Sequence, residues 1–562
     1  MSTKINYEKI ISIAQLTLAL KKTKIKTSSR LDGETKKHFT EDKLITLHKE
    51  LKSQKYQPRP VKRIEIPKPN GSGVRPLGIA SLRDKIVQAS ILLELEPTLE
   101  KVFSEYSFGF RTGRNCHDAL YRVKYFWQNT TWLLSLDIQK YFDTINHEIL
   151  IKELHKYCDQ ATVEVIIKMI KCGYVNLTTN QKMDSLEEGT SQESLISPIL
   201  SNLYLHVLDL FVENHLIKFW NFGEERRFVK GYQSRKVLSA KDKLLLEEYP
   251  ELKGAVSKVK HNRWVLEGTL SRDPCDVKFR RLYYVRYADD ILLGFCGTKA
   301  EAEEIKEELI NFLQKVLKLT INPEKSAIAH FKDKNILFLG FYIRYMPNKI
   351  VVDKSKCIED GVTQLKSQAI NNASLKAPID RLLDRATDRK YAVKKENGNF
   401  RATSRRALTG LPEKDIVNRY SSIIRGILQY YSCVNQRSDL WSVVSLYRKS
   451  CALTLADKLK LRTAAQVFKK FGPFLSIKDI TGKEVTKLYY PQSLKTKVDF
   501  KRGQANIDEF SCIYRNEIYC SYRQQSSQVK DKCEIEECES SENLELHHLH
   551  PQKNISKTIY SV

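Results

Sequence analysis

Two adjacent aspartates, Asp289 and Asp290, lie in the segment YVRYADDILLGF, which otherwise has the apolar character of a buried strand. Two like charges side by side repel each other unless a cation neutralises them. A hairpin with a tight turn at ADD would hold both carboxylates at one end of a sheet. Magnesium suits such a place, because it is a hard ion that binds one or two carboxylates together with substrate phosphates.

A third aspartate, Asp137, ends the apolar segment WLLSLD. On a neighbouring strand it would complete a site for two ions, which stabilise both the attacking and the leaving oxygen of an in-line phosphoryl transfer. A bare Asp-Asp pair is more often a solvated turn. The flanking apolar strands and the upstream junction of a strand with an aspartate instead favour a catalytic magnesium site made of Asp137, Asp289 and Asp290.

The elements that would position these residues alternate between strand and helix. A hairpin is predicted around the Pro-Asn-Gly turn of VKRIEIPKPNGSGVRPLGI, and basic helices precede it. Residues 81–103 have the apolar periodicity of a helix, and residues 132–157 predict a strand that runs into a helix. Residues 224–281 are charged and irregular, as expected of an insertion between core strands. From about residue 365 the pattern is mainly helical.

Composition limits the class of protein. A chain of 562 residues is long enough for several domains. Its 94 lysines and arginines exceed its 67 acidic residues, and the formal net charge of +27 points to a polyanionic partner, nucleic acid first. No apolar run reaches the length that spans a bilayer, so we expect a soluble protein without a secretion signal. Twelve scattered cysteines favour a reducing compartment.

Five sequence blocks carry a family resemblance, and they occur in a fixed order: IPKPNGSGVRPLGI, SFGFRTGRNCHDAL, DIQKYFD, YADD and FLGFYI. They resemble the signature blocks of group II intron reverse transcriptases, also called intron-encoded maturases. The resemblance implies an α+β fold, in which the fingers and palm of a right-hand polymerase precede an all-helical thumb and maturase domain and a small basic tail.

The same resemblance implies the domain boundaries. They are residues 1–110 for N-terminal helices and fingers, 111–365 for the palm with its insertion at about 224–281, 366–475 for the helical thumb and maturase domain X, 476–525 for a basic region that contacts DNA, and 526–562 for a truncated remnant of an HNH endonuclease domain.

Nucleotide-binding roles are also implied. Phe142 resembles the aromatic residue that packs against the sugar and excludes a 2'-hydroxyl; the alternative is a core aromatic. Lys68 and Arg75 flank the PNGSG turn and would reach the triphosphate of a dNTP, although either one alone could be a solvated charge. Gln192 and Lys325, the lysine of NPEKS, complete the predicted nucleotide-binding set.

One block departs from the family pattern. Where the family usually has a glycine-rich GTPQGGxxSP segment, this chain has GTSQESLISP, with Glu193 and Ser194 in place of the glycines. Glycine there would let the backbone approach nucleotide and template closely. Glutamate adds bulk and negative charge beside phosphates, so the departure bears on polymerase rate and processivity.

The helical segment interleaves arginines and lysines with tyrosines, which brings phosphate contacts and stacking surfaces together. A single basic residue there is more often a solvated charge than an RNA ligand. The residues that we expect to bind RNA are Arg425, Tyr430, Tyr431, Arg448, Lys449 and Lys458.

The C-terminal tail resembles the start of an HNH endonuclease domain. Its candidate residues are Cys533, Cys538, His547 and His548. Four residues separate the two cysteines instead of two, and no second cysteine pair follows, so a four-ligand zinc site cannot be assembled in the expected way. A remnant without DNA cleavage is the favoured interpretation, which leaves zinc in the tail doubtful.

The leading hypothesis is an RNA-directed DNA polymerase that uses Mg²⁺ and dNTPs, binds its own group II intron RNA, and assists splicing and homing at a DNA target. The alternatives are a splicing maturase whose polymerase and endonuclease activities have decayed, and an independent host reverse transcriptase. Lysine-, asparagine- and isoleucine-rich composition favours an organellar gene, mitochondrial ahead of plastid, with a bacterial cytoplasmic protein as the alternative. Oligomeric state is left open, with a dimer as one arrangement.

Overall fold

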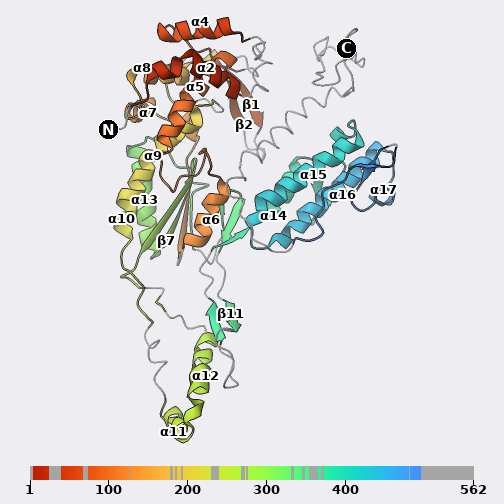
Figure 1. Ribbon diagram of the computed structural model, residues 1–562. Helices are drawn as coiled ribbons and strands as arrows, with labels where there is room; N and C mark the ends of the chain where they lie inside the picture. The colour runs from red at the N-terminus through yellow and green to blue at the C-terminus, as the bar shows by residue number, and fades with distance from the viewer. Residues whose placement is uncertain are drawn as a thin grey trace. The chain divides into compact units, whose positions relative to one another are not determined.

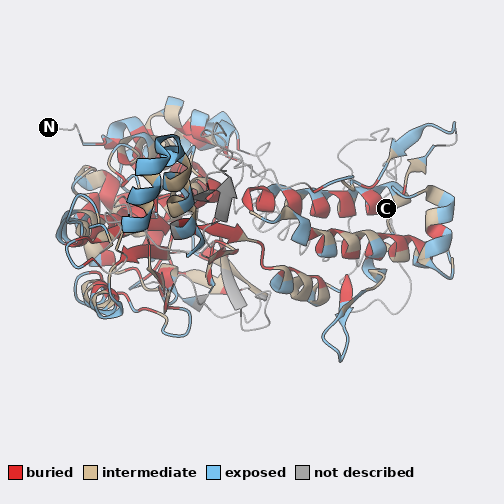
Figure 2. Cartoon of the chain, turned by 90° about the horizontal axis from the view of Figure 1, so that it is seen from below, coloured by how far each residue is buried: buried red, intermediate tan, exposed pale blue. Residues whose placement is uncertain are grey.

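The computed structural model describes residues 4–494, apart from residues 24–38, 68–73, 128–129, 177–181, 184–186, 191–193, 230–238, 268–271, 274–275, 331–334, 345–348, 353–364, 369–372 and 480. The described chain divides into two compact units, the first ending at Lys376 and the second beginning at Ala377 (Figure 1). In each unit the buried residues lie in the interior, and exposed residues cover the outer faces of the helices (Figure 2).

A four-stranded antiparallel sheet forms the centre of the first unit, with strand order β6-β7-β3-β8. Its strands are β3 (Trp132–Asp137), β6 (Arg281–Tyr287), β7 (Asp290–Cys296) and β8 (Ala327–His330). Strand β7 is buried from Ile291 to Cys296 without interruption. Because successive side chains of a strand point to opposite faces, this sheet is covered on both sides at β7. The predicted strand pair around ADD is therefore confirmed as a hairpin at the centre of a buried sheet.

Helices pack on this sheet and surround it. Helix α6 (Cys116–Phe126) contacts β6, and α13 (Lys299–Lys315) contacts β3. Helix α6 begins at an asparagine capping box in which Asn115 and Asp118 bond each other's backbone N–H groups. The remaining helical elements of this region are the 3₁₀ turn Tyr141–Asp143, α7 (His147–Leu154), α8 (Gln160–Lys171), α9 (Ser197–Phe211), the π turn Val212–Leu216 and α10 (Ile217–Trp220).

A second sheet, of order β2-β1-β4-β5, contains the predicted hairpin. Strands β1 (Val61–Pro67) and β2 (Val74–Ile79) pair antiparallel, and β4 (Tyr174–Asn176) and β5 (Lys182–Met183) extend the sheet. Four helices accompany it: α1 (Tyr7–Ile11), α2 (Ile13–Lys22), α4 (Glu41–Lys52) and α5 (Leu82–Leu99). Ser81 caps α5 by accepting from the Asp84 N–H, so the expected helix after the hairpin is confirmed.

Short strands complete the first unit. Strands β9 (Ile336–Phe338), β10 (Phe341–Arg344) and β13 (Ser374–Lys376) form one sheet, and β11 (Lys349–Val352) pairs with β12 (Leu365–Gln368).

The insertion differs from the expected irregular segment, because it contains helices α11 (Ala240–Glu248) and α12 (Lys253–Leu266). A capping box between Ser239 and Asp242 starts α11, and Lys260 of α12 lies 2.5 Å from Asp242. Local capping and ion pairing form these helices without a strong apolar face, which is why hydrophobic periodicity did not reveal them.

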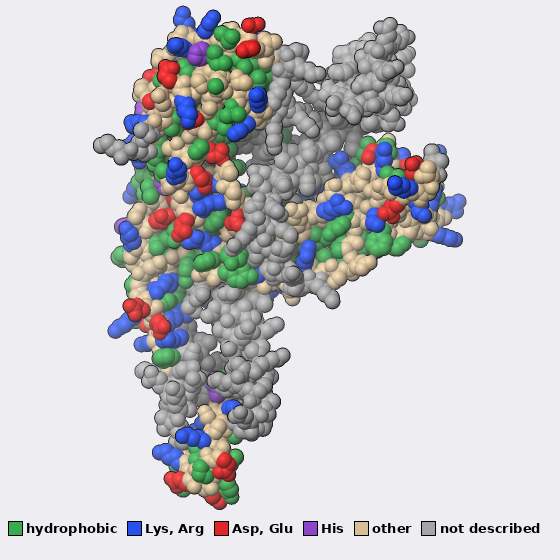
Figure 3. Space-filling model, viewed as in Figure 1, with side chains coloured by type: hydrophobic (Ala, Val, Ile, Leu, Met, Phe, Trp, Pro, Cys, Tyr) green, Lys and Arg blue, Asp and Glu red, His purple; other side chains and the backbone are tan. Residues whose placement is uncertain are grey.

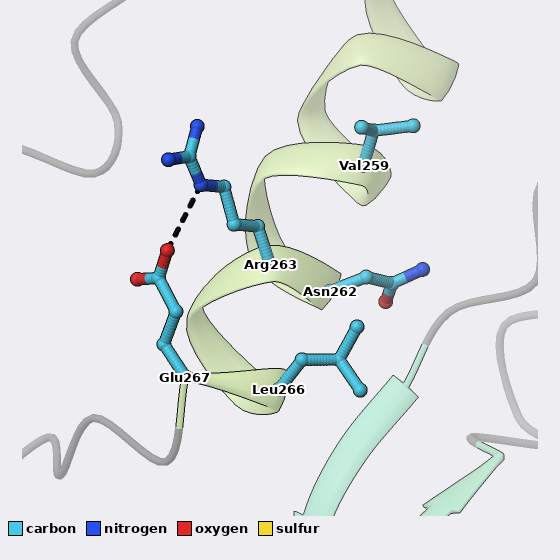
Figure 4. Close-up of a pocket in the computed structure, with 5 residues that line it drawn as sticks. All are labelled: Val259, Asn262, Arg263, Leu266 and Glu267. Atoms are coloured by element: carbon cyan, nitrogen blue, oxygen red, sulfur yellow. Dashed lines mark hydrogen bonds and ion pairs between the residues drawn. The ribbon is translucent and has the colours of Figure 1, made fainter.

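A pocket lies on the surface of α12, lined by Val259, Asn262, Arg263, Leu266 and Glu267 (Figure 4). Arg263 and Glu267 form an ion pair one helical turn apart, with 2.9 Å between Nε and Oε1. None of the residues predicted to take part in chemistry lines this pocket.

The second unit is mainly helical, as predicted, with two added hairpins. It contains α14 (Ile379–Asp388), β14 (Ala392–Lys394), β15 (Phe400–Ala402), α15 (Glu413–Tyr430), α16 (Trp441–Lys458), α17 (Ala464–Phe471), β16 (Ile477–Lys478) and β17 (Glu484–Thr486). Its core includes a buried ring cluster, in which Tyr391 makes edge contacts with Tyr420 and Tyr447. Residues 476–494, expected to begin a separate basic region, lie in this unit, where β17 contacts α15.

Candidate active site and nucleic-acid interface

The three predicted aspartates lie at one end of the central sheet. Strands β3 and β7 pair with Asp137 directly opposite Asp290. The β6–β7 hairpin closes with Tyr287 opposite Asp290, which leaves Ala288 and Asp289 as its two-residue turn. Strand pairing therefore brings together residues that are about 150 positions apart in the sequence.

Like charges dominate the electrostatics of this end of the sheet. Burial raises the pKa of Asp290 to about 7, and the neighbouring carboxylates of Asp289 and Asp137 add to the rise. Lys325 opposes it, since its Nζ lies 3.0 Å from Oδ2 of Asp137. The carboxylates thus carry unbalanced negative charge, which a bound cation would relieve.

The residues fit magnesium on their donor chemistry. In the described part of the chain no three acidic, His or Cys side chains are already gathered as a ligand group. Magnesium does not require one, because it keeps several waters and takes one or two carboxylates together with substrate phosphates. Asp290 and Asp137, paired across two strands, supply hard oxygen ligands of the right kind.

Phe142 lies just beyond β3, in the 3₁₀ turn, and its side chain is partly buried. The preceding Tyr141 anchors the turn, because its ring is buried and its hydroxyl donates to the Ser201 carbonyl at 2.7 Å. The ring of Phe142 faces that of Phe110, with 6.3 Å between centroids in an edge-to-face arrangement. Phe110 is 40% exposed and was not singled out from the sequence.

Phe110 has an unusual backbone. Its φ of +58° is a genuine outlier for a bulky residue, and such strain persists only where the surroundings impose it. Arg111 next to it is buried and donates to the Ser107 carbonyl at 2.9 Å. In the sequence, the SFGFRTGR block indicated that this segment is important, but it did not single out Phe110.

The segment that carries the family departure begins on the same turn. The Gly189 N–H donates to the Ile145 carbonyl at 2.8 Å, and the Thr190 N–H donates to the Phe142 carbonyl at 2.7 Å. Gly189 has φ of +82°, and a Cβ there would lie 2.8 Å from the Asp143 carbonyl oxygen, so glycine is required. Gln192 and Glu193 lie outside the described residues, whereas Ser194 is partly exposed.

His147 holds this segment and was not found from the sequence. Its Nε2 lies 2.6 Å from the Gly189 carbonyl oxygen, so that nitrogen carries the proton. Burial lowers the pKa of His147, which keeps the ring neutral.

Of the two residues predicted to bind the triphosphate from the fingers, the structure describes only Arg75. Arg75 lies in β2 opposite Ile66, near the end of the hairpin. Lys68 follows β1 in the sequence and is outside the described residues. Their predicted contact with a triphosphate stays a prediction.

The basic residues of the second unit differ in how far they are engaged. Lys449 and Arg425 are exposed, and Arg425 stacks over the ring of Tyr489 at 4.9 Å. Arg448 is held between Phe468 and Tyr490 and donates to the Pro473 carbonyl at 2.8 Å. Basic side chains are also spread over the face of this unit seen in Figure 3.

Three other residues predicted to bind RNA instead contact residues of their own unit. Lys458 is mostly buried and lies 3.7 Å from Glu413. Tyr430 and Tyr431 are only 8% and 3% exposed, and their rings contact each other. Their burial leaves almost no ring face for stacking on a base, so packing accounts for both tyrosines.

The predicted tail residues Cys533, Cys538, His547 and His548 lie outside the described residues. None of the cysteines that the structure describes forms a disulfide; they are Cys116, Cys158, Cys172, Cys296, Cys433 and Cys451. Of the helices described, none combines the length and the apolar character needed to cross a bilayer.

Two family models match the chain. A model described as reverse transcriptase (RNA-dependent DNA polymerase) matches residues 66–224 and 264–343, and a model described as type II intron maturase matches residues 370–517. The gap between the two reverse transcriptase stretches contains α11 and all but the last turn of α12. That gap supports the interpretation of this region as an insertion.

Several curated proteins are similar in sequence to this chain. The chain is 32% identical over 472 residues to the putative COX1/OXI3 intron 1 protein of Saccharomyces cerevisiae, which covers 83% of this chain and 54% of that protein. It is 29% identical to the group II intron-encoded protein LtrA of Lactococcus lactis, over 92% of this chain and 84% of LtrA. Protein YkfC of Escherichia coli is 33% identical over 53% of this chain and 70% of YkfC.

Fold, site and matched models define a reverse transcriptase domain followed by an intron maturase domain. The chain belongs to the family of group II intron-encoded reverse transcriptases and maturases. It spans about half the length of the yeast relative.

Proposed function

We propose that the protein is an RNA-directed DNA polymerase that binds its host group II intron RNA, assists its splicing and supports its mobility by reverse transcription. One observation carries the polymerase part: Asp137 stands opposite Asp290 at the end of two paired strands, with Asp289 in the adjoining turn. In this proposal the central sheet is the palm, the β1–β2 hairpin belongs to the fingers, and the second unit is the thumb.

The chemistry is a nucleotidyl transfer from dNTPs, with magnesium held by the three aspartates. Two bound ions supply positive charge that stabilises the attacking and leaving oxygens of an in-line displacement. Asp290 is the carboxylate whose charge most needs a cation, because burial raises its pKa to about 7. Lys325, 3.0 Å from Asp137, places a further positive group beside the phosphates.

Other residues orient the nucleotide. Phe142 is partly exposed in the turn that follows the strand of Asp137, a position from which it would contact the sugar and exclude a 2'-hydroxyl. Lys68, Arg75 and Gln192 would bind the triphosphate and the template-paired base.

Intron RNA binding would use the exposed cations and rings of the second unit, Arg425 and Tyr489 first among them. Structured RNA is recognised through shape, backbone and 2'-hydroxyls, which suits a surface of separate cations. Residues 476–525 would contact the DNA target.

A second candidate function is a splicing maturase without polymerase activity. Glu193 and Ser194 in place of glycines favour it, because they add bulk and charge where nucleotide phosphates would lie. The yeast relative supports an organellar gene, mitochondrial ahead of plastid, and the Lactococcus relative supports the bacterial alternative.

The deciding experiment is extension of a DNA primer on an RNA template by the purified protein with Mg²⁺ and dNTPs, with intron splicing measured in parallel. We expect extension by the wild type, its loss in Asp289→Ala, and splicing assistance in both. Glu304→Gln, which removes an exposed charge on α13, is the control. A wild-type protein that assists splicing but extends no primer would replace the polymerase proposal with the maturase one.

A further inference from the structure

The turn that carries the catalytic aspartates is conformationally strained. Ala288, its first residue, has φ of +55°, in the left-handed region that glycine and asparagine tolerate better than alanine. Such a conformation costs on the order of 1 kcal/mol or more and persists where the surroundings impose it. Contacts beyond the backbone pairing of the hairpin must therefore hold this turn.

Arg286 makes one of those contacts. Its side chain is fully buried in β6, and its Nη1 donates to the Ala288 carbonyl at 2.9 Å. Its Nε and Nη2 donate to the two oxygens of Asp209 on α9 at 2.8 and 2.6 Å, and the Tyr284 hydroxyl donates to the same carboxylate at 2.7 Å. Both ion-pair partners are 0% exposed.

A fully buried ion pair needs an explanation other than stability. Desolvation of two charges consumes most of their mutual attraction, so an apolar pair of the same volume would often stabilise the fold as well. Only the guanidinium, however, can bind Asp209 and still donate to the Ala288 carbonyl. This suggests that its geometry serves the turn.

Asn202 of α9 makes the second contact. Its Oδ1 accepts from Arg286 Nη1 at 3.1 Å, and its Nδ2 donates to the Gly109 carbonyl at 2.7 Å. Gly109 lies against the turn so closely that a Cβ there would be 2.4 Å from the Ala288 nitrogen. Asn202 therefore holds, at the same time, the arginine that binds the turn and the backbone that presses on it.

The segment before Gly109 is fixed to β6 as well. The Phe108 N–H donates to the Arg286 carbonyl, and the Arg286 N–H donates to the Tyr106 carbonyl, each at 2.9 Å. The backbone of the SFGF block is thus hydrogen-bonded to strand β6 of the hairpin.

We infer that Asn202 and Arg286 are positioning residues that hold the Ala288–Asp289 turn in its strained conformation and so set where the catalytic carboxylates lie. They would act through the Ala288 carbonyl and Gly109, and not by binding nucleotide or metal themselves. The inference rests on the proposed function for its consequence in catalysis, since a misplacement of about 1 Å in an active site costs up to about 100-fold in rate.

The test compares Asn202→Leu, which keeps the branched shape of the side chain and removes both hydrogen bonds, with Tyr204→Phe on the same helix. Tyr204 is fully buried and its hydroxyl donates to the Leu317 carbonyl at 2.6 Å, away from the hairpin. Binding of Mn²⁺ to the protein alone is followed by electron paramagnetic resonance, alongside kcat, KM for dNTP and the melting temperature.

We expect Asn202→Leu to weaken Mn²⁺ binding several-fold and to lower kcat about 10- to 100-fold, with KM within about twofold because no nucleotide contact is lost. Tyr204→Phe should change neither Mn²⁺ binding nor kcat. Equal Mn²⁺ affinity in both variants would overturn the inference, even if the wild type proved unable to polymerise.

Gly109→Ala provides an independent variant if Asn202→Leu does not fold. It removes no buried polar side chain, and its added Cβ pushes directly on the Ala288 nitrogen. Weaker Mn²⁺ binding with an unchanged melting temperature supports positioning of the turn, and unchanged Mn²⁺ binding contradicts it.

Discussion

The hairpin end of the central sheet and the surface of the helical unit use charge in opposite ways. At the hairpin, negative charge is concentrated at Asp137, Asp289 and Asp290. The ion pair between Arg286 of the hairpin and Asp209 is fully buried. In the helical unit, cations are spread out, and Arg425 and Arg448 stack over aromatic rings at the surface.

This difference separates two kinds of recognition. A metal site needs a few ligands held within fractions of an ångström, so backbone pairing and buried polar contacts fix them. An RNA surface gains affinity from many weak phosphate contacts, each of which tolerates movement. A single substitution at the hairpin should therefore remove most of the polymerase activity, whereas a single substitution on the helical unit should lower RNA affinity only by a small factor.

The largest expected effect is on catalysis. Asp137→Asn should lower the rate of primer extension by about 1000-fold, because it removes a ligand for charge stabilisation worth several kcal/mol. Intron affinity should be unchanged, since Asp137 lies in the first unit. Single-turnover extension and filter binding measure the two quantities, with Glu304→Gln as control; a fall in intron affinity equal to the fall in rate would contradict the separation.

The next largest effect is on folding. Arg286→Met should lower the free energy of unfolding by about 3 to 5 kcal/mol, because Asp209 is left as a buried unpaired charge. The double variant Arg286→Met with Asp209→Leu should recover much of this lost free energy of unfolding. Its primer extension should nevertheless stay slower than that of the wild type. Urea unfolding gives the free energies; a double variant with wild-type extension would argue against any positioning by Arg286.

A graded effect is expected on the helical unit. Tyr489→Leu should weaken intron binding about 3- to 10-fold, as expected for loss of an exposed cation–aromatic pair of about 1 kcal/mol. Tyr430→Phe, which alters a buried ring, is the matched control and should leave affinity unchanged. If Tyr430→Phe weakened binding as much as Tyr489→Leu, the assignment of exposed and buried tyrosines would fail.

The smallest expected effect is on pH dependence. His147 has a pKa lowered from 6.5 by burial, so the unfolded chain binds its proton more readily and the stability that the neutral ring supplies is lost as pH falls below 6.5. Burial lowers the pKa of His206 in the same direction. His147→Gln should flatten, without abolishing, the fall in melting temperature between about pH 7 and 5. An unchanged slope would show that the ring is not held neutral.

The sequence by itself determined the elements whose signals are local. Apolar runs bounded by polar residues fixed β3, β6 and β7, and the Pro-Asn-Gly turn fixed the β1–β2 hairpin. The ordered blocks also indicated the family, which the matched models and relatives confirm. Apolar patterning succeeds there because each strand is buried along most of its length.

Only the tertiary structure decided which side chains are free to act. Tyr430 and Tyr431 lie among basic residues in the sequence, which predicted that they bind RNA, yet helix packing buries them. Tyr489, in contrast, remains exposed beside Arg425. Asn202 and Arg286 gave no chemical signal of their own, because their roles arise from contacts between residues about 80 to 180 positions apart. Pairing of distant strands placed Asp137 opposite Asp290, and side-chain exposure and long-range hydrogen bonds follow from that packing, which local pattern cannot encode.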